Sequence, residues 1–217
     1  RLGPEAPIAL DGVLAREDYY SRQGFVSCHV SRRMQGTGAA ALAAWPSSWP
    51  GDVAEGLRVV PLAALPFDDV VDFDARHYGA PRPDFLRRWI TPAGGLALGA
   101  VDPDGALRAA GVVRACVTGF KVGPLFAADA GAARLVLRGL LEHVGAATVV
   151  LDVPDVNAEA VAMASALGWE EVFGCVRMVH GPVPSLPWEQ IRPQHVRAGL
   201  SPWAGRDRSR DSPVRAA

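Results

Sequence analysis

The predicted fold is decided by residues 114–180, which read RACVTGFKVGPLFAADAGAARLVLRGLLEHVGAATVVLDVPDVNAEAVAMASALGWEEVFGCVRMVH. Their apolar and small residues predict, in order, a strand, a turn, a helix, a strand, a helix and a strand. We expect the first strand at residues 113–120 and the first helix at residues 127–144, where apolar side chains recur at helical spacing. Strands that alternate with helices in this way are typical of an α/β fold.

The second half of the stretch carries start and stop signals. Residues 148–153 form a short β-branched run that suits a strand buried on both faces, and Pro154 stops it. Asn157 is a natural N-cap for a helix over residues 158–167, and Gly168 stands where many helices end in a left-handed residue. We therefore predict a strand followed by a helix with defined ends.

Five residues of this unit keep the spacing of the Asn, Ala, Leu, Gly and Phe that mark the last helix of the GNAT acetyltransferases: Asn157, Ala160, Met163, Gly168 and Trp169. More narrowly, VRACVTGFKVGPLFAAD and VVLDVPDVNAEA resemble the C-terminal half of bacterial tandem-GNAT proteins, in which a second acetyltransferase-like domain follows a first. Upstream, DFDARHYGAPRPDFLRRWI is similar to the opening helices of that second domain. The resemblance implies an α/β (α+β) fold with a mixed, mostly antiparallel central sheet and helices on both faces.

Residues 8–33 repeat the pattern of the central stretch in miniature, with a strand end, a short helix and a strand. Tyr20, Gly24 and Phe25 match the Tyr, Gly and Phe of the last GNAT helix and of the strand after it. This segment resembles the C-terminal portion of a first GNAT domain. Because the chain opens with Arg1 rather than Met, we expect it to be a fragment of a longer protein.

The sequence predicts four segments. Residues 1–36 are expected to be the remnant of the first GNAT domain. Residues 37–56 are rich in Gly, Ala, Ser and Trp-Pro pairs and are expected to be a linker. We expect the tryptophans of this linker to dock on a neighbouring surface. Residues 57–187 are expected to form the second GNAT-like domain. Residues 188–217 are predicted to be a divergent, disordered tail, because Arg, Ser, Pro and Gly replace any apolar period there.

Two local signals organise the first part of the second domain. Residues 66–90 predict helix in two pieces, separated by the Gly and Pro residues at 79–83. Apolar runs flank the turn sequence Asp102-Pro103-Asp104-Gly105, which predicts a β-hairpin.

The composition is that of a globular protein without a strong charge. Of the 217 residues 49% are hydrophobic, mean hydropathy is +0.12 and the net charge is −1. A sizeable core is therefore possible, and we expect neither nucleic acid nor a membrane as partner. Cys28, Cys116 and Cys175 share no metal-ligand spacing, so we expect reduced thiols in a cytoplasmic protein and no metal. No apolar run approaches the roughly 20 residues of a membrane helix, and no signal peptide is recognisable.

Acetyl transfer from a thioester requires a cradle for the pyrophosphate, which backbone N–H groups at a helix N-terminus can supply. The resemblance places that cradle at Val122, Gly123, Leu125 and Phe126. It also implies that Asn157 hydrogen-bonds the amide-bearing arm of acetyl-CoA. Only Gly123 is small, Pro124 has no N–H, and the two bulky side chains crowd a phosphate. A working cradle and a tight, apolar strand-to-helix turn both remain open, as do cofactor binding and simple N-capping for Asn157.

The resemblance also suggests catalytic residues. GNAT enzymes often use a Tyr of the last helix to protonate the leaving thiolate, and this position falls on Ala164 in the second domain and on Tyr20 in the first. Asp152 and Asp155 flank a strand end, where a carboxylate can receive an amine or its proton, or can merely stabilise a turn. Lys121 and Arg114 can meet a phosphate or carboxylate, or can be strand ends that reach solvent.

We therefore predict that the chain carries the second, degenerate domain of an acetyl-CoA-dependent N-acetyltransferase that acts on an amine of a small molecule or peptide. The first GNAT domain of the same chain is its expected partner, and a homodimer is left open. The alternative is a catalytically silent GNAT-like module that binds a small metabolite or braces a neighbouring domain.

Overall fold

The computed structural model describes residues 7–47, 49, 56–183, 185–187 and 190–191. Almost all of the tail predicted at residues 188–217 lies outside the described residues. Where the chain is described, no helix has the length and apolar character needed to cross a lipid bilayer.

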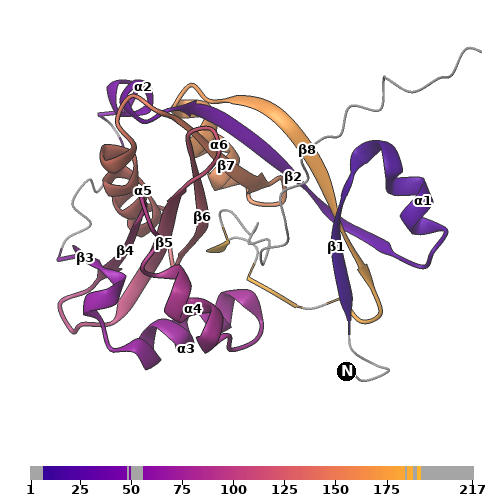
Figure 1. Cartoon of the computed structure of the whole chain (residues 1–217), viewed down its shortest axis with the longest axis horizontal. Coiled ribbons are helices and arrows are strands. Elements are labelled where there is room, and N and C mark those ends of the chain that lie inside the picture. The colour runs from indigo at the N-terminus through magenta and orange to yellow at the C-terminus, as the bar shows by residue number, and fades with distance from the viewer. Residues whose placement is uncertain (1–6, 48, 50–55, 184, 188–189, 192–217) are drawn as a thin grey trace, which may run out of the picture.

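The fold is built on one eight-stranded sheet with the strand order β1-β8-β2-β7-β6-β5-β4-β3 (Figure 1). Neighbouring strands are antiparallel except β6 and β7, which are parallel. The predicted mixed, mostly antiparallel sheet is therefore confirmed. The strands are β1 Ile8–Val13, β2 Val26–Thr37, β3 Arg58–Pro61, β4 Leu96–Val101, β5 Leu107–Ala115, β6 Phe120–Ala127, β7 Thr148–Pro154 and β8 Glu170–His180.

Helices cover both faces of the sheet and enclose two cores. The larger core contains buried residues of α2, α5 and α6, and the smaller contains buried residues of α3 together with Phe126 of β6. The apolar face predicted for the central helix, which includes Leu137 and Leu141, is fully buried. The helices are α1 Glu17–Ser21, α2 Gly38–Ala43, α3 Phe67–Tyr78, α4 Pro83–Trp89, α5 Ala130–Val144 and α6 Ala158–Ala166, with 3₁₀ turns η1 Leu14–Arg16 and η2 Leu62–Ala64.

Most elements match their predicted ranges. The hairpin of β4 and β5 turns at the predicted Asp-Pro-Asp-Gly sequence, where the Asp102 carboxylate accepts the Ala106 N–H. The two helical pieces are α3 and α4, and Gly79 ends α3 with a φ of +91°. Trp45 and Trp49 pack against the larger core, as expected of docking side chains.

The strand predicted at residues 113–120 is wrong. β5 ends at Ala115, β6 begins at Phe120, and the four residues between them form a turn in which the Cys116 N–H donates to the Gly119 carbonyl. Gly119 has a φ of +64°, and a Cβ there would lie 2.3 Å from the Thr148 carbonyl oxygen. The turn is thus possible only because position 119 is a glycine that packs directly on the start of β7.

The N-terminal strands β1 and β2 join the sheet by pairing with the C-terminal strands β7 and β8. β1 pairs with β8, β2 pairs with β7, and the long strands β2 and β8 pair with each other between the two ends of the molecule (Figure 1). Asp11 lies opposite Arg177 in the first pair, and Asp152 lies opposite Arg33 in the second. The units β1–α1–β2 and β7–α6–β8 therefore take equivalent places in the strand order β1-β8-β2-β7.

The predicted linker contains regular structure. Thr37 accepts the Ala40 N–H and so caps α2, which packs on the end of α5: a Cβ on Gly38 would lie 2.6 Å from the carbonyl oxygens of Leu141 and Gly145. The division into domains is a separate matter and stays a prediction.

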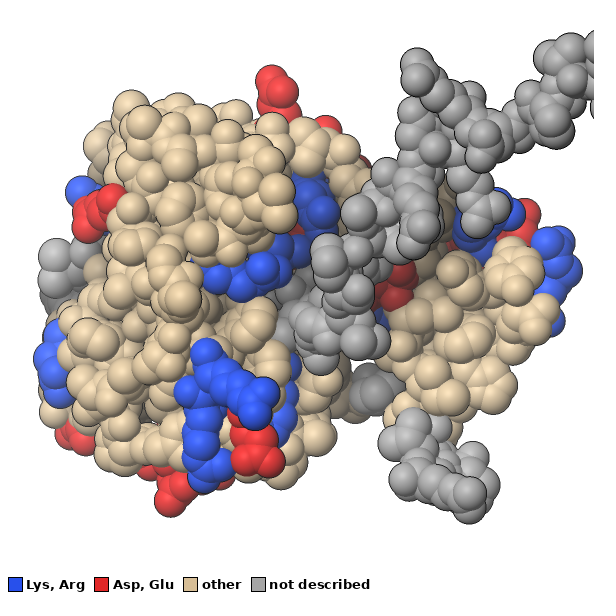
Figure 2. Space-filling view, in the orientation of Figure 1, with Lys and Arg blue, Asp and Glu red and all other residues tan. Residues whose placement is uncertain are grey.

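Figure 2 shows Lys and Arg interspersed with Asp and Glu on the face drawn, most of which is uncharged.

Candidate functional site

The central feature of the site is a fork between the two parallel strands. β6 and β7 pair at only three positions, which end with Val122 opposite Leu151. Beyond this point β6 runs on to Ala127 paired with β5 but no longer with β7, so the two strands separate. A fork beside Val122 is what the acetyltransferase interpretation requires.

The protein's own main chain lies in this fork. Phe126 pairs with Ala110 of β5 on one side and forms an antiparallel bridge with Ile191. The Asn157 side-chain Nδ2 donates to the Ile191 carbonyl over 3.1 Å, and Ile191 is fully buried. Asn157 also accepts the Ala160 N–H at 2.9 Å, so it is the predicted N-cap of α6 and at the same time a clamp on Ile191.

The four predicted cradle residues lie inside β6 rather than in a turn. Leu125 packs against Gly111 of β5, Phe126 stacks on His77 with 5.0 Å between ring centroids, and the Gly123 carbonyl accepts the Trp89 Nε1–H at 3.1 Å. The predicted position of the strand-to-helix turn, Val122 to Phe126, is therefore wrong, because this apolar run continues the strand to Ala127. Their role in binding acetyl-CoA stays a prediction.

The true strand-to-helix turn follows at residues 128–129. The Asp129 carboxylate accepts the Ala132 N–H at 2.8 Å and is the N-cap of α5. A carboxylate thus already uses the helix N-terminus at which a phosphate would otherwise bind. Sequence reasoning missed this residue, although an Asp directly before an apolar-periodic helix is a recognised N-cap signal.

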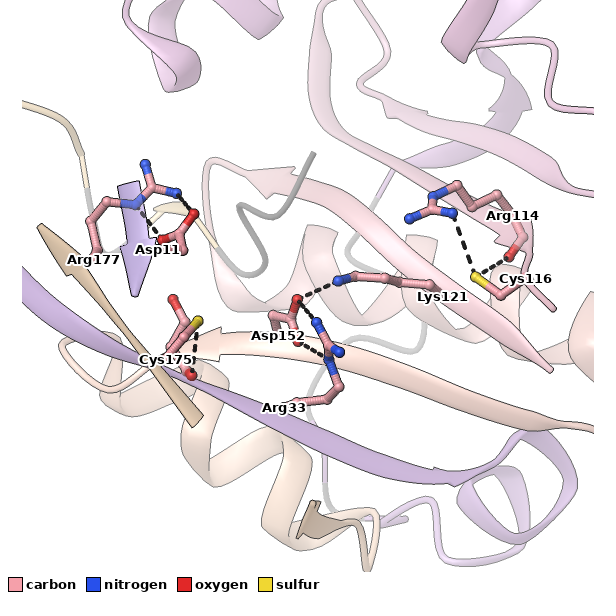
Figure 3. Close-up of polar contacts among 9 residues, drawn as sticks. Asp11, Arg33, Arg114, Cys116, Lys121, Asp152, Cys175 and Arg177 are labelled. Atoms are coloured by element: carbon pink, nitrogen blue, oxygen red, sulfur yellow. Dashed lines mark hydrogen bonds and ion pairs between the residues drawn. The ribbon is translucent and has the colours of Figure 1, made fainter. Parts of the chain in front are cut away.

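Beside the fork lies a buried charged cluster formed by Arg33, Lys121 and Asp152 (Figure 3). Arg33 of β2 donates to both oxygens of the Asp152 carboxylate, from Nε at 2.7 Å and from Nη2 at 3.0 Å. The Lys121 ammonium of β6 donates to the same carboxylate. Asp152 is 2% exposed and Lys121 is 8% exposed, so this cluster is held largely away from water.

The cluster shifts the ionisation of its members. Burial alone would raise the pKa of Asp152, but the hydrogen bonds and charges of Arg33 and Lys121 outweigh it and hold that pKa below its ordinary value. Burial lowers the pKa of Lys121, and the neighbouring Asp152 opposes only part of that change. Asp152 is therefore the ionised centre of the site, and it is not free to take a proton from a substrate.

The cluster borders a cavity of about 570 Å³, which is large enough for a small organic molecule. Strands β1, β2, β5, β6, β7 and β8 and the turn after β5 supply the lining: Asp11, Val13, Arg33, Gln35, Arg114, Cys116, Thr118, Lys121, Val150, Phe173 and Cys175. A second bidentate ion pair joins Arg177 to Asp11, a residue of the lining, at 2.6 and 3.0 Å (Figure 3).

The family is decided by comparison with known sequences. A sequence model described as "Acetyltransferase (GNAT) domain" matches residues 70–191, which is more than half of the chain. The chain belongs to the GNAT acetyltransferase family. Members of this family are acyltransferases that generally use acetyl-CoA.

Individual GNAT relatives agree with this assignment. Holothin acyltransferase of Pseudoalteromonas sp. (strain SANK 73390) is 25% identical over 178 residues, which cover 82% of this chain and 56% of that protein. A solved structure from Pyrococcus horikoshii superimposes with a TM-score of 0.65 at 20% identity, over 88% of this chain and 58% of that one. A tandem GNAT protein from the clavulanic acid biosynthesis pathway gives 0.53 at 17% identity, over 82% and 65%. This chain therefore spans between 56% and 65% of the length of these three relatives.

The predicted catalytic residues of this GNAT chain do not lie together. Tyr20 lies in α1, where its ring contacts Phe25 and Gly12, and α1 lies beside β1, well apart from β6 (Figure 1). Asp152 instead meets Arg33 and Lys121, and Arg33 was not predicted as a site residue.

Two neighbouring positions of the GNAT chain have structural roles. Asp155 accepts the Val30 N–H at 3.1 Å and donates its own N–H to the Val30 carbonyl at 2.8 Å, which is the turn-stabilising alternative. Ala164, the general-acid position, is fully buried in the larger core. Neither residue supplies a proton-transfer group to the fork.

Proposed function

We propose that this chain is the C-terminal part of an acetyl-CoA-dependent N-acetyltransferase, and that residues 57–187 are its second GNAT unit, which itself transfers no acetyl group. The observation that carries the proposal is the position of Ile191 in the fork between β6 and β7. A thioester arm that entered the fork would have to displace this buried main chain together with its bond to Asn157.

Two further features support a non-transferring second unit. A phosphate that approached the N-terminus of α5 would meet the negative charge of the Asp129 carboxylate, which has already taken one of the free N–H groups. Ala164 has no proton to give to a leaving thiolate. The residues of this unit therefore do not fit acetyl-CoA, and we derive no transfer step through them.

The pairing of the N-terminal strands with the C-terminal ones supports a preceding GNAT unit. β1–α1–β2 and β7–α6–β8 are equivalent by their pairing, so we propose that residues 8–37 end a first unit in which β1 is completed by β8. The similarity to a tandem GNAT protein is in keeping with this arrangement. In it the second unit braces the first through the shared strands β2 and β8.

We place acetyl transfer in the first unit, with Tyr20 as the candidate general acid and an amine as acceptor. The name of the holothin acyltransferase, to which the chain is similar, favours a small-molecule amine over a peptide. We further propose that the protein is cytoplasmic, in keeping with the absence of a disulfide among the described residues.

Two calorimetric titrations test the proposal: acetyl-CoA into this chain, and acetyl-CoA into the natural protein that contains it. We expect no binding by this chain, one site in the natural protein, and release of free CoA thiol there when small amines are added. Binding by this chain that is lost in Gly123→Trp would overturn the non-transferring assignment. A natural protein that releases no CoA with any amine would overturn the acetyltransferase assignment.

A further inference from the structure

The cavity beside the charged cluster is separate from the filled fork. In β6 and β7, Val122, Val149 and Leu151 pack into the core that contains α5, whereas Lys121 and Val150 alternate with them and point to the opposite face, where they line the cavity. Arg114 lies directly opposite Lys121 in the β5–β6 pair and therefore shares that face. Ile191 is not part of the lining, so this space stays available while the fork is occupied.

The cavity holds more positive than negative charge. Arg33, Arg114 and Lys121 line it, but Arg33 and Lys121 share the single carboxylate of Asp152. The other carboxylate, Asp11, is already bound by Arg177. Within the described residues, the cations of the cavity therefore exceed the carboxylates that face them.

Among the three cations that line the cavity, Arg114 is the one that meets no carboxylate of the described residues. Its Nη1 contacts the Cys116 sulfur at 3.5 Å, and its guanidinium lies 5.4 Å from the centre of the Trp89 ring. Neither partner neutralises its charge. Figure 3 shows Arg114 and Lys121 extending in the same direction, from neighbouring strands toward the Asp11–Arg177 pair.

Lys121 also keeps hydrogen-bonding capacity. An ammonium group has three donors, and the described structure gives this one a single acceptor, the Asp152 carboxylate. Burial lowers the Lys121 pKa, which indicates that the protonated form lacks part of the stabilisation it would have in water. An added anion would supply that stabilisation, and Gln35 and Thr118 on the lining offer further polar contacts.

We propose that this cavity binds a small molecule through an oxyanion group, a carboxylate or a phosphate, which Arg114 and Lys121 hold. The guanidinium presents paired donors that match the two oxygens of such a group, and the ammonium adds a point charge beside it. The inference goes beyond the proposed function, because it requires no acetyl-CoA and no transfer step. It gives the second GNAT unit a ligand of its own.

Calorimetric titration of the full chain at low salt tests this site, with succinate and inorganic phosphate as the probes and uncharged succinamide as the control. We expect one or both anions to bind and succinamide not to bind, and the stronger anion identifies the oxyanion. Arg114→Gln should weaken binding by about tenfold, the effect of losing one charged hydrogen-bonded contact. Arg114→Lys, which keeps the charge, should lose less.

Arg138→Gln is the matched control, because it removes the same charge from α5, on the other face of the sheet. Its affinity for the anions should equal that of the wild-type chain. No binding of either anion at millimolar concentration would overturn the proposal, as would an equal loss in Arg114→Gln and Arg138→Gln. Because these titrations contain no acetyl-CoA, their failure is distinguishable from a failure of the proposed function.

Discussion

Replacing Asp152 with asparagine should destabilise the protein more than any exposed charge change. Among the described residues, Asp152 is the only carboxylate paired with Lys121, and it also holds Arg33. The variant keeps the shape of the side chain but leaves two cations without a counter-charge. Lys121 is only 8% exposed, so its ammonium would regain little hydration in the variant.

The expected magnitude follows from the burial of the cluster. Removing one partner of a buried ion pair typically costs about 3–5 kcal/mol. The Arg33 side chain is 33% exposed and can regain some hydration, so we expect the lower end, about 3 kcal/mol. In a protein of this size that corresponds to a fall in Tm of about 6–12 °C.

Thermal and urea unfolding followed by circular dichroism measure this loss. Asp84→Asn is the matched control: it makes the same change at an ion pair with Arg87 in which the Asp84 side chain is 96% exposed, and it should leave the Tm unchanged. Adding Lys121→Met to Asp152→Asn should recover stability, because it removes the stranded ammonium. A Tm for Asp152→Asn equal to that of Asp84→Asn, or a further loss in the double variant, would refute the reasoning.

The same cluster predicts a dependence on acid. The folded-state pKa of Asp152 lies below its ordinary value, so its contribution to stability is present above about pH 4 and is lost as the pH falls through the folded-state pKa. The Asp152→Asn variant lacks this titration. Its stability should therefore approach that of the wild-type protein as the solution is acidified, and parallel pH profiles would contradict the assignment.

Three further changes test other contacts. Asn157→Ser should keep the cap of α6 but lose the donor to Ile191. Its free energy of unfolding in urea should therefore lie below that of wild type and about 1 kcal/mol above that of Asn157→Ala. A Ser variant as stable as wild type would contradict this. Burial raises the pKa of the Cys175 thiol to about 11 and Cys116 is exposed, so iodoacetamide at about pH 8 should alkylate Cys116 first in mass spectra, and equal rates would be contrary evidence. Burial lowers the pKa of His77, so protonation of this side chain favours the unfolded chain. The stability of the wild-type protein should therefore decrease below about pH 6.5, and that of His77→Phe should decrease less. Identical pH profiles of the two proteins would rule this out.

Elements that begin or end at local turn and capping residues could be predicted from the sequence. The hairpin turn at residues 102–105, the helix break after Gly79 and the cap at Asn157 each depend on residues within one turn of the element they end. Their signals are therefore complete in a short window of sequence.

Junctions that depend on packing could not be predicted in the same way. Residues 122–127 form a run without a polar or charged side chain, which looks the same at the end of a buried strand as at the start of a buried helix. The glycine at position 119 is required by its contact with Thr148, 29 positions later, and no local pattern announces that contact.

By itself, the sequence determined most of the order of strands and helices, because that order follows from periodicity. The spacing of a few residues carried the GNAT resemblance, and the resemblance in turn implied the mixed sheet. Only the tertiary structure decided what the fork holds and where its charges meet. Arg33 reaches Asp152 across 119 positions, and Ile191 reaches Asn157 across 34. Such contacts arise when the sheet closes and buries groups that must then be paired, a condition that no short stretch of the chain records.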